Sequence, residues 1–201
     1  LLSNGKLTHS YPHSWRSKAP LVHRATSQWF ISMEEKDLRK KALKAIDNTD
    51  FYPERGRDRI RSMIETRPDW CVSRQRIWGV PLPLFVSKKT KEPLKDTEVI
   101  ENIAKIFENE GADCWFTDDP QKFLGKKYKK EDYIKSSDIV EVWFDSGATH
   151  SYVLEKRKDL AWPASMYLEG SDQHRGWFHS SLLESCGTRG KAPFKSILTH
   201  G

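Results

Sequence analysis

Residues 167–178 read Tyr-Leu-Glu-Gly-Ser-Asp-Gln-His-Arg-Gly-Trp-Phe, and they carry the clearest structural signal in the chain. Its apolar start predicts a strand, its glycine a turn, and its aromatic end the beginning of a helix. In an open parallel sheet, ligands bind beyond the carboxyl ends of the strands. Glu169, Asp172, Gln173 and His174 are therefore candidate binding residues. The alternative is that one polar side chain of the cluster only caps the following helix.

The same alternation of strands and helices extends to both sides of this stretch. We expect strand 138–144, helix 148–156, strand 164–168, helix 176–187 and strand 194–199. This order is typical of parallel βαβ units, and it predicts an α/β fold. The first strand ends in VWFDSG (142–147), where Trp143 is a candidate pocket wall, and the last ends at His200 and Gly201. We expect the three strand ends to define one crevice.

The first two thirds of the chain predict helices mixed with short strands. We expect strands within 20–32, helices over 34–46 and from about 57 to before 68, a β-hairpin over 84–95, and a helix from about 97 to 111. Apolar spacing in the last helix predicts burial of Ile100, Ile103, Ala104 and Phe107. Residues 117–138 are polar and Lys-rich, so we expect a solvated surface insertion there.

Composition limits the classes of protein that the chain can represent. It has 201 residues, a formal net charge of +6, 37% hydrophobic residues and eight Trp. No apolar run reaches the ~20 residues that a membrane-spanning helix needs, and the apolar content excludes a wholly disordered chain. The positive charge favours an anionic partner, with RNA as the first hypothesis. The chain begins without Met and ends on a strand-like run, so we interpret it as an internal part of a longer protein.

The cysteines indicate neither a disulfide framework nor a metal site. Cys71, Cys114 and Cys186 lie far apart, and no C-x-x-C pair is present. Such spacing is typical of a protein of the reducing cytoplasm. We therefore expect no metal in this chain.

Four segments together identify a family. Residues 67–83 (RPDWCVSRQRIWGVPLP), VWFDSG at 142–147, EGSDQHRGWF at 169–178 and LTHG at 198–201 closely resemble the isoleucyl-tRNA synthetases of bacterial type. The resemblance covers essentially the whole chain. It implies the second half of a class I Rossmann-like catalytic domain with inserted α+β connective segments.

The resemblance also implies a division of the chain and a reaction. Residues 1–45 correspond to the end of the editing insertion, 46–137 to connective insertions, and 138–201 to the second half of the catalytic domain. The family uses ATP with Mg²⁺ to activate isoleucine and transfers it to tRNA(Ile), and we expect a cytoplasmic, monomeric full-length enzyme. Both ATP signature motifs and most of the editing pocket lie outside these residues, so the isolated chain is expected to be inactive.

Site residues follow from the resemblance position by position. Glu169 and Gly170 correspond to contacts of the isoleucyl-adenylate, Asp172 and Gln173 to the adenylate and ribose pair, Trp143 and Trp177 to the walls of the isoleucine pocket, and His200 and Gly201 to the adenine side. An apolar pocket discriminates one methylene by only ~1–3 kcal/mol, which explains why such a family needs editing.

The stretch 67–83 is a candidate contact with tRNA. Arg74 and Arg76 are expected to pair with phosphates, and Trp70 or Trp78 to stack on a base. The equally weighted alternative is that both Trp pack a domain junction and both Arg bridge carboxylates. Two alternatives to the whole interpretation stay open: a free-standing basic, Trp-rich RNA-binding module, and part of a valyl- or leucyl-tRNA synthetase.

Overall fold

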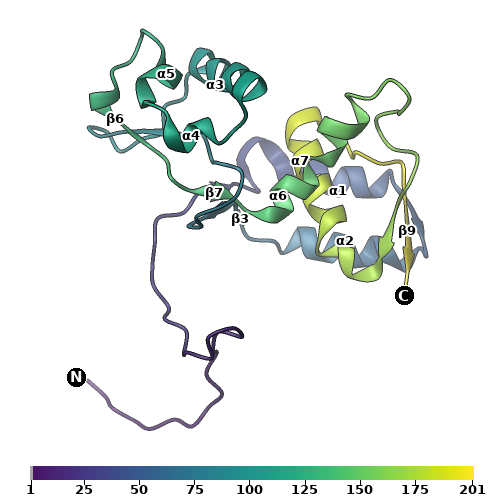
Figure 1. The fold of residues 1–201 in the computed structure, drawn as a ribbon. Coiled ribbons are helices and arrows are strands. Elements are labelled where there is room, and N and C mark those ends of the chain that lie inside the picture. Colours follow the sequence, from purple (N-terminus) through teal and green to yellow (C-terminus); the bar gives the residue numbers. More distant parts are fainter. Residues whose placement is uncertain (1) are drawn as a thin grey trace.

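The computed structural model describes residues 2–201 and shows two packed units with separate hydrophobic cores. The larger unit contains α1, α2, α6 and α7 together with β9, and the smaller contains α3, α4, α5 and β6 (Figure 1). Residues 2–25 extend away from both units, and the chain joins the larger unit just before β1 (Phe30–Ile31). No helix within residues 2–201 combines the length and the apolar character needed to cross a membrane.

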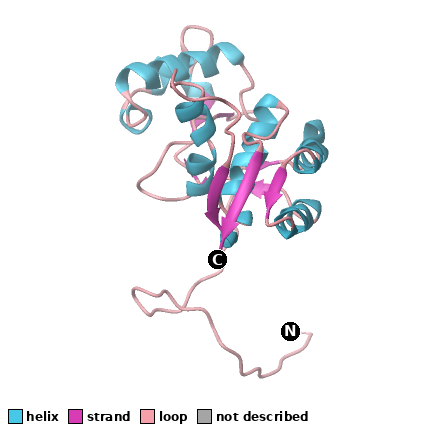
Figure 2. Cartoon of the chain, turned by 90° about the vertical axis from the view of Figure 1, so that its right-hand side faces the viewer, coloured by secondary structure: helices cyan, strands magenta, loops and turns pink. Residues whose placement is uncertain are grey.

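A three-stranded parallel sheet organises the larger unit. Its order is β2 (Asp50–Tyr52), β9 (Ser196–His200), β8 (Tyr167–Gly170), and the three strands lie side by side in Figure 2. In register, Ile197 of β9 lies opposite Phe51 and Tyr167. The expected strands near 164–168 and 194–199 are thus parallel neighbours. Strand β2 was not predicted from the sequence, because three residues are too few for a periodic signal.

Helices cover one face of this sheet. The covering helices are α1 (Leu38–Asp47), which follows the 3₁₀ turn η1 (Glu35–Asp37), α2 (Arg55–Glu65) and α7 (Trp177–Arg189). Alternate strand residues point to opposite faces, so Phe51, Tyr167 and Ile197 join the core with the helices. Leu168, which follows Tyr167 in β8, points to the other face and is 55% exposed.

The segment expected as strand 138–144 folds differently. Only Ile139–Val140 forms a strand, β7, and it pairs antiparallel with β4 (Ser73–Arg74) in a separate two-stranded sheet. VWFDSG is helix α6 (Val142–Gly147), because the Glu141 side chain accepts from the backbone N–H of Trp143 and caps the first turn. The prediction of a third strand end at this position was wrong. The helix expected next is the π-helix η3 (His150–Leu154).

The smaller unit packs three helices on a two-stranded sheet. It contains β5 (Phe85–Ser87), α3 (Thr97–Glu110), α4 (Cys114–Thr117), α5 (Pro120–Leu124), η2 (Lys130–Asp132) and β6 (Tyr133–Lys135). Asp96 caps α3 by accepting from the N–H of Glu98 at 2.9 Å.

The hairpin expected over 84–95 forms, because the N–H of Ser87 donates to the carbonyl of Glu92, the N–H of Leu94 donates to that of Phe85, and Val86 is bridged to Pro93; β5 also pairs with β6. Two other expectations about the smaller unit need correction. Residues 117–138 are not only a solvated insertion, because Phe123 and Leu124 are buried in the core with Trp115. In α3, Ile103 is buried and Phe107 partly buried, whereas Ile100 and Ala104 face solvent.

The N-terminal third is less regular than its composition suggests. Of residues 20–32, only β1 is a strand, and it pairs antiparallel with β3 (Trp70–Cys71). The boundary expected at 45/46 falls within α1, whose Leu38 and Ala42 share a core with Leu182 of α7. The division into editing, connective and catalytic segments stays a prediction.

Candidate active site

The polar cluster that follows β8 is a tight 3₁₀ turn, η4 (Ser171–His174). A Cβ on Gly170 would lie 2.6 Å from Oδ1 of Asp172, so the glycine leaves room for this carboxylate at the end of the strand. Gly170 lies opposite His200 of β9, and Glu169 lies opposite Thr199. The ends of β8 and β9 therefore bring Glu169, Gly170, Asp172 and His200 together, as the sequence predicted.

Gln173 links this turn to the following helix. Its Nε2 donates to Oδ2 of Asp172 at 3.0 Å, and its Oε1 accepts from the backbone N–H of Trp177 at 2.9 Å. The amide thus orients the Asp172 carboxylate and satisfies one of the free N–H groups at the start of α7. Gln173 therefore caps α7. Because hydrogen bonds hold both polar atoms of its amide, the side chain also has a fixed orientation toward a ligand.

Two tryptophans flank the turn. A Cβ on Gly176 would lie 3.0 Å from Cη2 of Trp143, so the Trp143 ring rests against this glycine. The ring of Trp177 stacks on Tyr167 with parallel planes and centroids 4.0 Å apart, and its Nε1 donates to the carbonyl of Ser146 at 3.0 Å. Trp143 reaches the site from α6 and not from a strand end, yet the structure brings it to the same turn as Trp177.

A cavity of about 380 Å³ opens at the carboxyl ends of the sheet strands. Its lining includes Thr199, His200 and Gly201 of the expected adenine side and also Arg55 and Arg59 of α2. Sequence reasoning missed these two arginines. The run RGRDRIR at 55–61 was the available signal, but only the parallel pairing of β2 with β9 brings α2 to this position.

His174 closes the wall of this cavity in its neutral form. It is buried against Gly56 of α2, and burial lowers the pKa of its imidazole. Its Nδ1 lies 2.7 Å from the carbonyl oxygen of Ser171. Because a carbonyl only accepts, Nδ1 carries the proton and Nε2 is a free acceptor. The positive charge of the cavity therefore comes from Arg55 and Arg59.

The basic stretch 67–83 divides into a buried and an exposed part. Trp70 is 6% exposed, its ring packs on Phe144 with centroids 5.9 Å apart, and its Nε1 donates to Glu141 at 2.8 Å. It has no free face for a base, because it lies in the core of the larger unit. Trp78 is 90% exposed.

A second, smaller hollow of about 240 Å³ lies beside the exposed part. Arg74, Arg76 and Trp78 line it together with Glu141. Gly79 in its wall has a φ of +147°, and a Cβ there would lie 2.3 Å from Cδ1 of Ile139. The glycine is required for this close approach, which fixes the exposed Trp78 next to β7.

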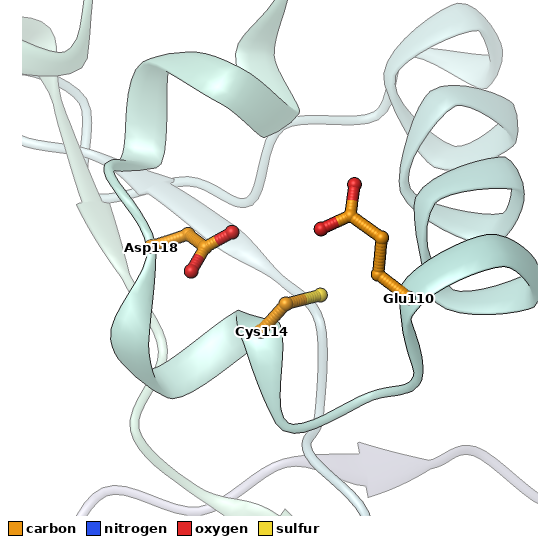
Figure 3. A group of neighbouring side chains, drawn as sticks. All are labelled: Glu110, Cys114 and Asp118. Atoms are coloured by element: carbon orange, nitrogen blue, oxygen red, sulfur yellow. The ribbon is translucent and has the colours of Figure 1, made fainter.

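Another group of possible ligand side chains lies in the smaller unit. Atoms of Glu110, Cys114 and Asp118 all lie within 4.8 Å of one another and point toward a common centre (Figure 3). Lys122 Nζ already binds Glu110 at 2.5 Å and Asp118 at 2.7 Å. Burial raises the pKa of the Cys114 thiol, which donates to the carbonyl of Gly111. An ammonium and a protonated thiol make this an ion-pair network, not a site prepared for a cation.

The comparisons with known proteins agree with the sequence segments. The chain is 79% identical over 201 residues to an isoleucine–tRNA ligase of Pelagibacter ubique, 56% over 208 residues to one of Caulobacter vibrioides, and 54% over 210 residues to one of Zymomonas mobilis. Each match covers 100% of this chain and 21–22% of the relative, so the chain spans about a fifth of their length. Residues 15–201 match the family model described as tRNA synthetases class I (I, L, M and V). Because this model matches most of the chain, the chain belongs to the class I tRNA synthetases.

Proposed function

We propose that this chain is part of an isoleucine–tRNA ligase and that it supplies contacts for the isoleucyl-adenylate. The whole enzyme joins isoleucine to the α-phosphate of ATP, releases pyrophosphate, and transfers the isoleucyl group to tRNA(Ile). The observation that carries the proposal is the meeting of Trp143, Gln173 and Trp177 around Gly176, next to the ends of β8 and β9. The high identity to isoleucine–tRNA ligases over the whole chain supports the same conclusion.

The residues of the site divide by chemistry. Trp143 and Trp177 offer the apolar walls that a branched aliphatic side chain needs. The Asp172 carboxylate, held by Gln173, suits ribose hydroxyls because it only accepts hydrogen bonds. Glu169 and Gly170 lie at the same strand end and contact the adenylate, and His200 and Gly201 lie on the adenine side.

The charge of the cavity at the strand ends fits a nucleotide. Arg55 and Arg59 line it, and neutral His174 leaves them as its positive groups. ATP with Mg²⁺ supplies the phosphate that is attacked and the leaving pyrophosphate. This chain contributes by binding and orienting the two reactants, an effect worth several orders of magnitude in rate.

We further propose that Arg74, Arg76 and Trp78 contact tRNA. Trp78 offers a free aromatic face for base stacking, and the two guanidinium groups line the hollow beside it. tRNA is thus the anionic partner that the charge of +6 favours. We expect the complete enzyme to act as a monomer in the cytoplasm, and the 201 residues alone to be inactive because the ATP signature motifs lie elsewhere.

The test is amino-acid-dependent exchange of pyrophosphate into ATP by the complete protein that contains this chain. Isoleucine should support exchange far better than valine or leucine. A preference for valine or leucine would assign the protein to one of those specificities. Absence of exchange with all three amino acids, combined with salt-dependent tRNA binding, would leave a basic RNA-binding module.

A further inference from the structure

Glu141 is a buried carboxylate that joins two stretches of the chain far apart in sequence. It is 5% exposed. Its Oε1 accepts from the indole Nε1 of Trp70 at 2.8 Å, and its Oε2 accepts from the backbone N–H of Trp143 at 3.2 Å. Its own N–H donates to the carbonyl of Val72 at 2.8 Å. Glu141 is therefore bonded to the basic stretch 67–83 and to helix α6 at once.

Two arginines of the basic stretch offset the charge of this carboxylate. A guanidinium nitrogen of Arg74 lies 3.7 Å from Oε2. The guanidinium of Arg67 lies over the Trp70 ring, 5.5 Å from its centroid; burial lowers its pKa, and attraction to Glu141 opposes that shift. A buried charge is costly unless such partners surround it. Truncating Glu141 would leave the Trp70 indole N–H without its acceptor.

Helix α6 is the element through which both aromatic walls are held. Trp143 lies in its first turn, and the N–H of that residue is bonded to Glu141. Trp177 belongs to α7, but its Nε1 donates to the carbonyl of Ser146 in α6. A rotation or shift of α6 therefore displaces Trp143, which belongs to this helix, and also Trp177, whose indole N–H is bonded to it. Gly147 at the end of α6 lies against Glu184 of α7, which leaves little room for independent movement.

From these contacts we infer that Glu141 is a positioning residue for the isoleucine pocket. By capping α6 and holding it to Trp70, it sets where Trp143 and Trp177 stand. Glu141 acts through these side chains, since it is itself enclosed. The inference rests on the proposed function, and it predicts that amino-acid specificity depends on a carboxylate outside the pocket.

The test compares three variants of the complete ligase by pyrophosphate exchange. Glu141→Gln keeps the shape but turns an amide NH₂ toward an N–H donor. Trp70→Phe removes the indole N–H together with part of the buried ring and keeps an aromatic ring beside Phe144. Glu155→Gln is the matched control, because its carboxylate is bonded to Arg189 and makes no contact with Trp70 or Trp143.

We expect Glu141→Gln to raise the KM for isoleucine roughly 10- to 100-fold, because the fit of a single methylene in an apolar pocket changes discrimination by about that factor. The KM for ATP and kcat should stay within about twofold, which distinguishes a displaced pocket from general damage. The preference for isoleucine over valine should fall in parallel. Trp70→Phe should change the same quantities in the same direction by less, and Glu155→Gln should change none of them.

Two results would overturn the inference. One is an unchanged KM for isoleucine and an unchanged preference over valine in Glu141→Gln. The other is an equal loss in every kinetic constant, which indicates general structural damage. If the unsubstituted ligase shows no isoleucine-dependent exchange, the proposed function itself fails. Hydrogen exchange then decides: Glu141→Gln should lose amide protection in α6 and keep it in α3, and unchanged protection in α6 refutes the positioning role.

Discussion

Replacing Gly176 with Ala tests the packing on which the site depends. The new methyl group would lie 2.2 Å from Oε1 of Gln173 and 3.0 Å from Cη2 of Trp143, so both side chains must move. Overpacking of this kind costs about 1–3 kcal/mol. Displacement of Gln173 also breaks its bond from the Trp177 N–H, which contributes about 1 kcal/mol. The total is about 2–4 kcal/mol of lost stability.

The same substitution further along α7 provides the control. A Cβ on Gly187 would meet only Cδ1 of Leu38, at an ordinary 3.7 Å. Gly187→Ala should therefore stabilise the chain by about 0.5–1 kcal/mol through the helix preference of alanine. Urea unfolding followed by circular dichroism gives the free energy of unfolding of both variants. A Gly176→Ala chain as stable as the parent would contradict the described contacts of Gln173 and Trp143.

Three further changes have defined outcomes. Burial, and then repulsion from Asp145, raises the pKa of Glu184 to about 9. Between pH ~4.5 and pH ~9 the folded chain therefore keeps a proton on Glu184 that the unfolded chain releases. The free energy of unfolding falls as the pH rises through this range, by at most about 1.4 kcal/mol per pH unit. Glu184→Gln should flatten this dependence in urea titrations at several pH values. Arg76→Ala in the complete ligase should weaken tRNA binding and reduce the slope of log K against log salt concentration by about 1. An unchanged slope excludes a phosphate contact by Arg76. Trp115→Ala should cost about 3–5 kcal/mol and lower hydrogen-exchange protection in residues 84–136 while sparing α7; loss of protection in both units would show that their cores are not independent.

Elements with strong local signals were predictable. Helix α3 has an Asp cap, an apolar repeat and a closing glycine, and α7 follows a glycine turn. Such signals act within a few residues, so neighbouring segments hardly alter them. The strand–turn–helix motif at 167–178 was predictable for the same reason, and with it the grouping of Glu169, Gly170, Asp172 and Gln173.

Elements that depend on distant partners were not predictable. Residues 142–144 are Val, Trp and Phe, which favour a strand, but the cap by Glu141 and packing on α7 make them helical. Strand β2 exists because β9 offers an edge to pair with. Phe123 and Leu124 lie in a charged segment, and only the core around Trp115 explains their burial.

The sequence by itself determined the family segments, the polar turn after β8, the pair Trp143 and Trp177, and the helices with clear caps. Only the tertiary structure decided that Trp143 reaches the turn from a helix, that Arg55 and Arg59 line the cavity, and that Trp70 is buried while Trp78 is exposed. The difference arises from the distance along the chain over which each interaction acts. Caps, turns and periodicity act over one or two turns of chain, whereas burial and charge at the site depend on strand pairing and on contacts such as Trp70 with Glu141, 71 residues apart.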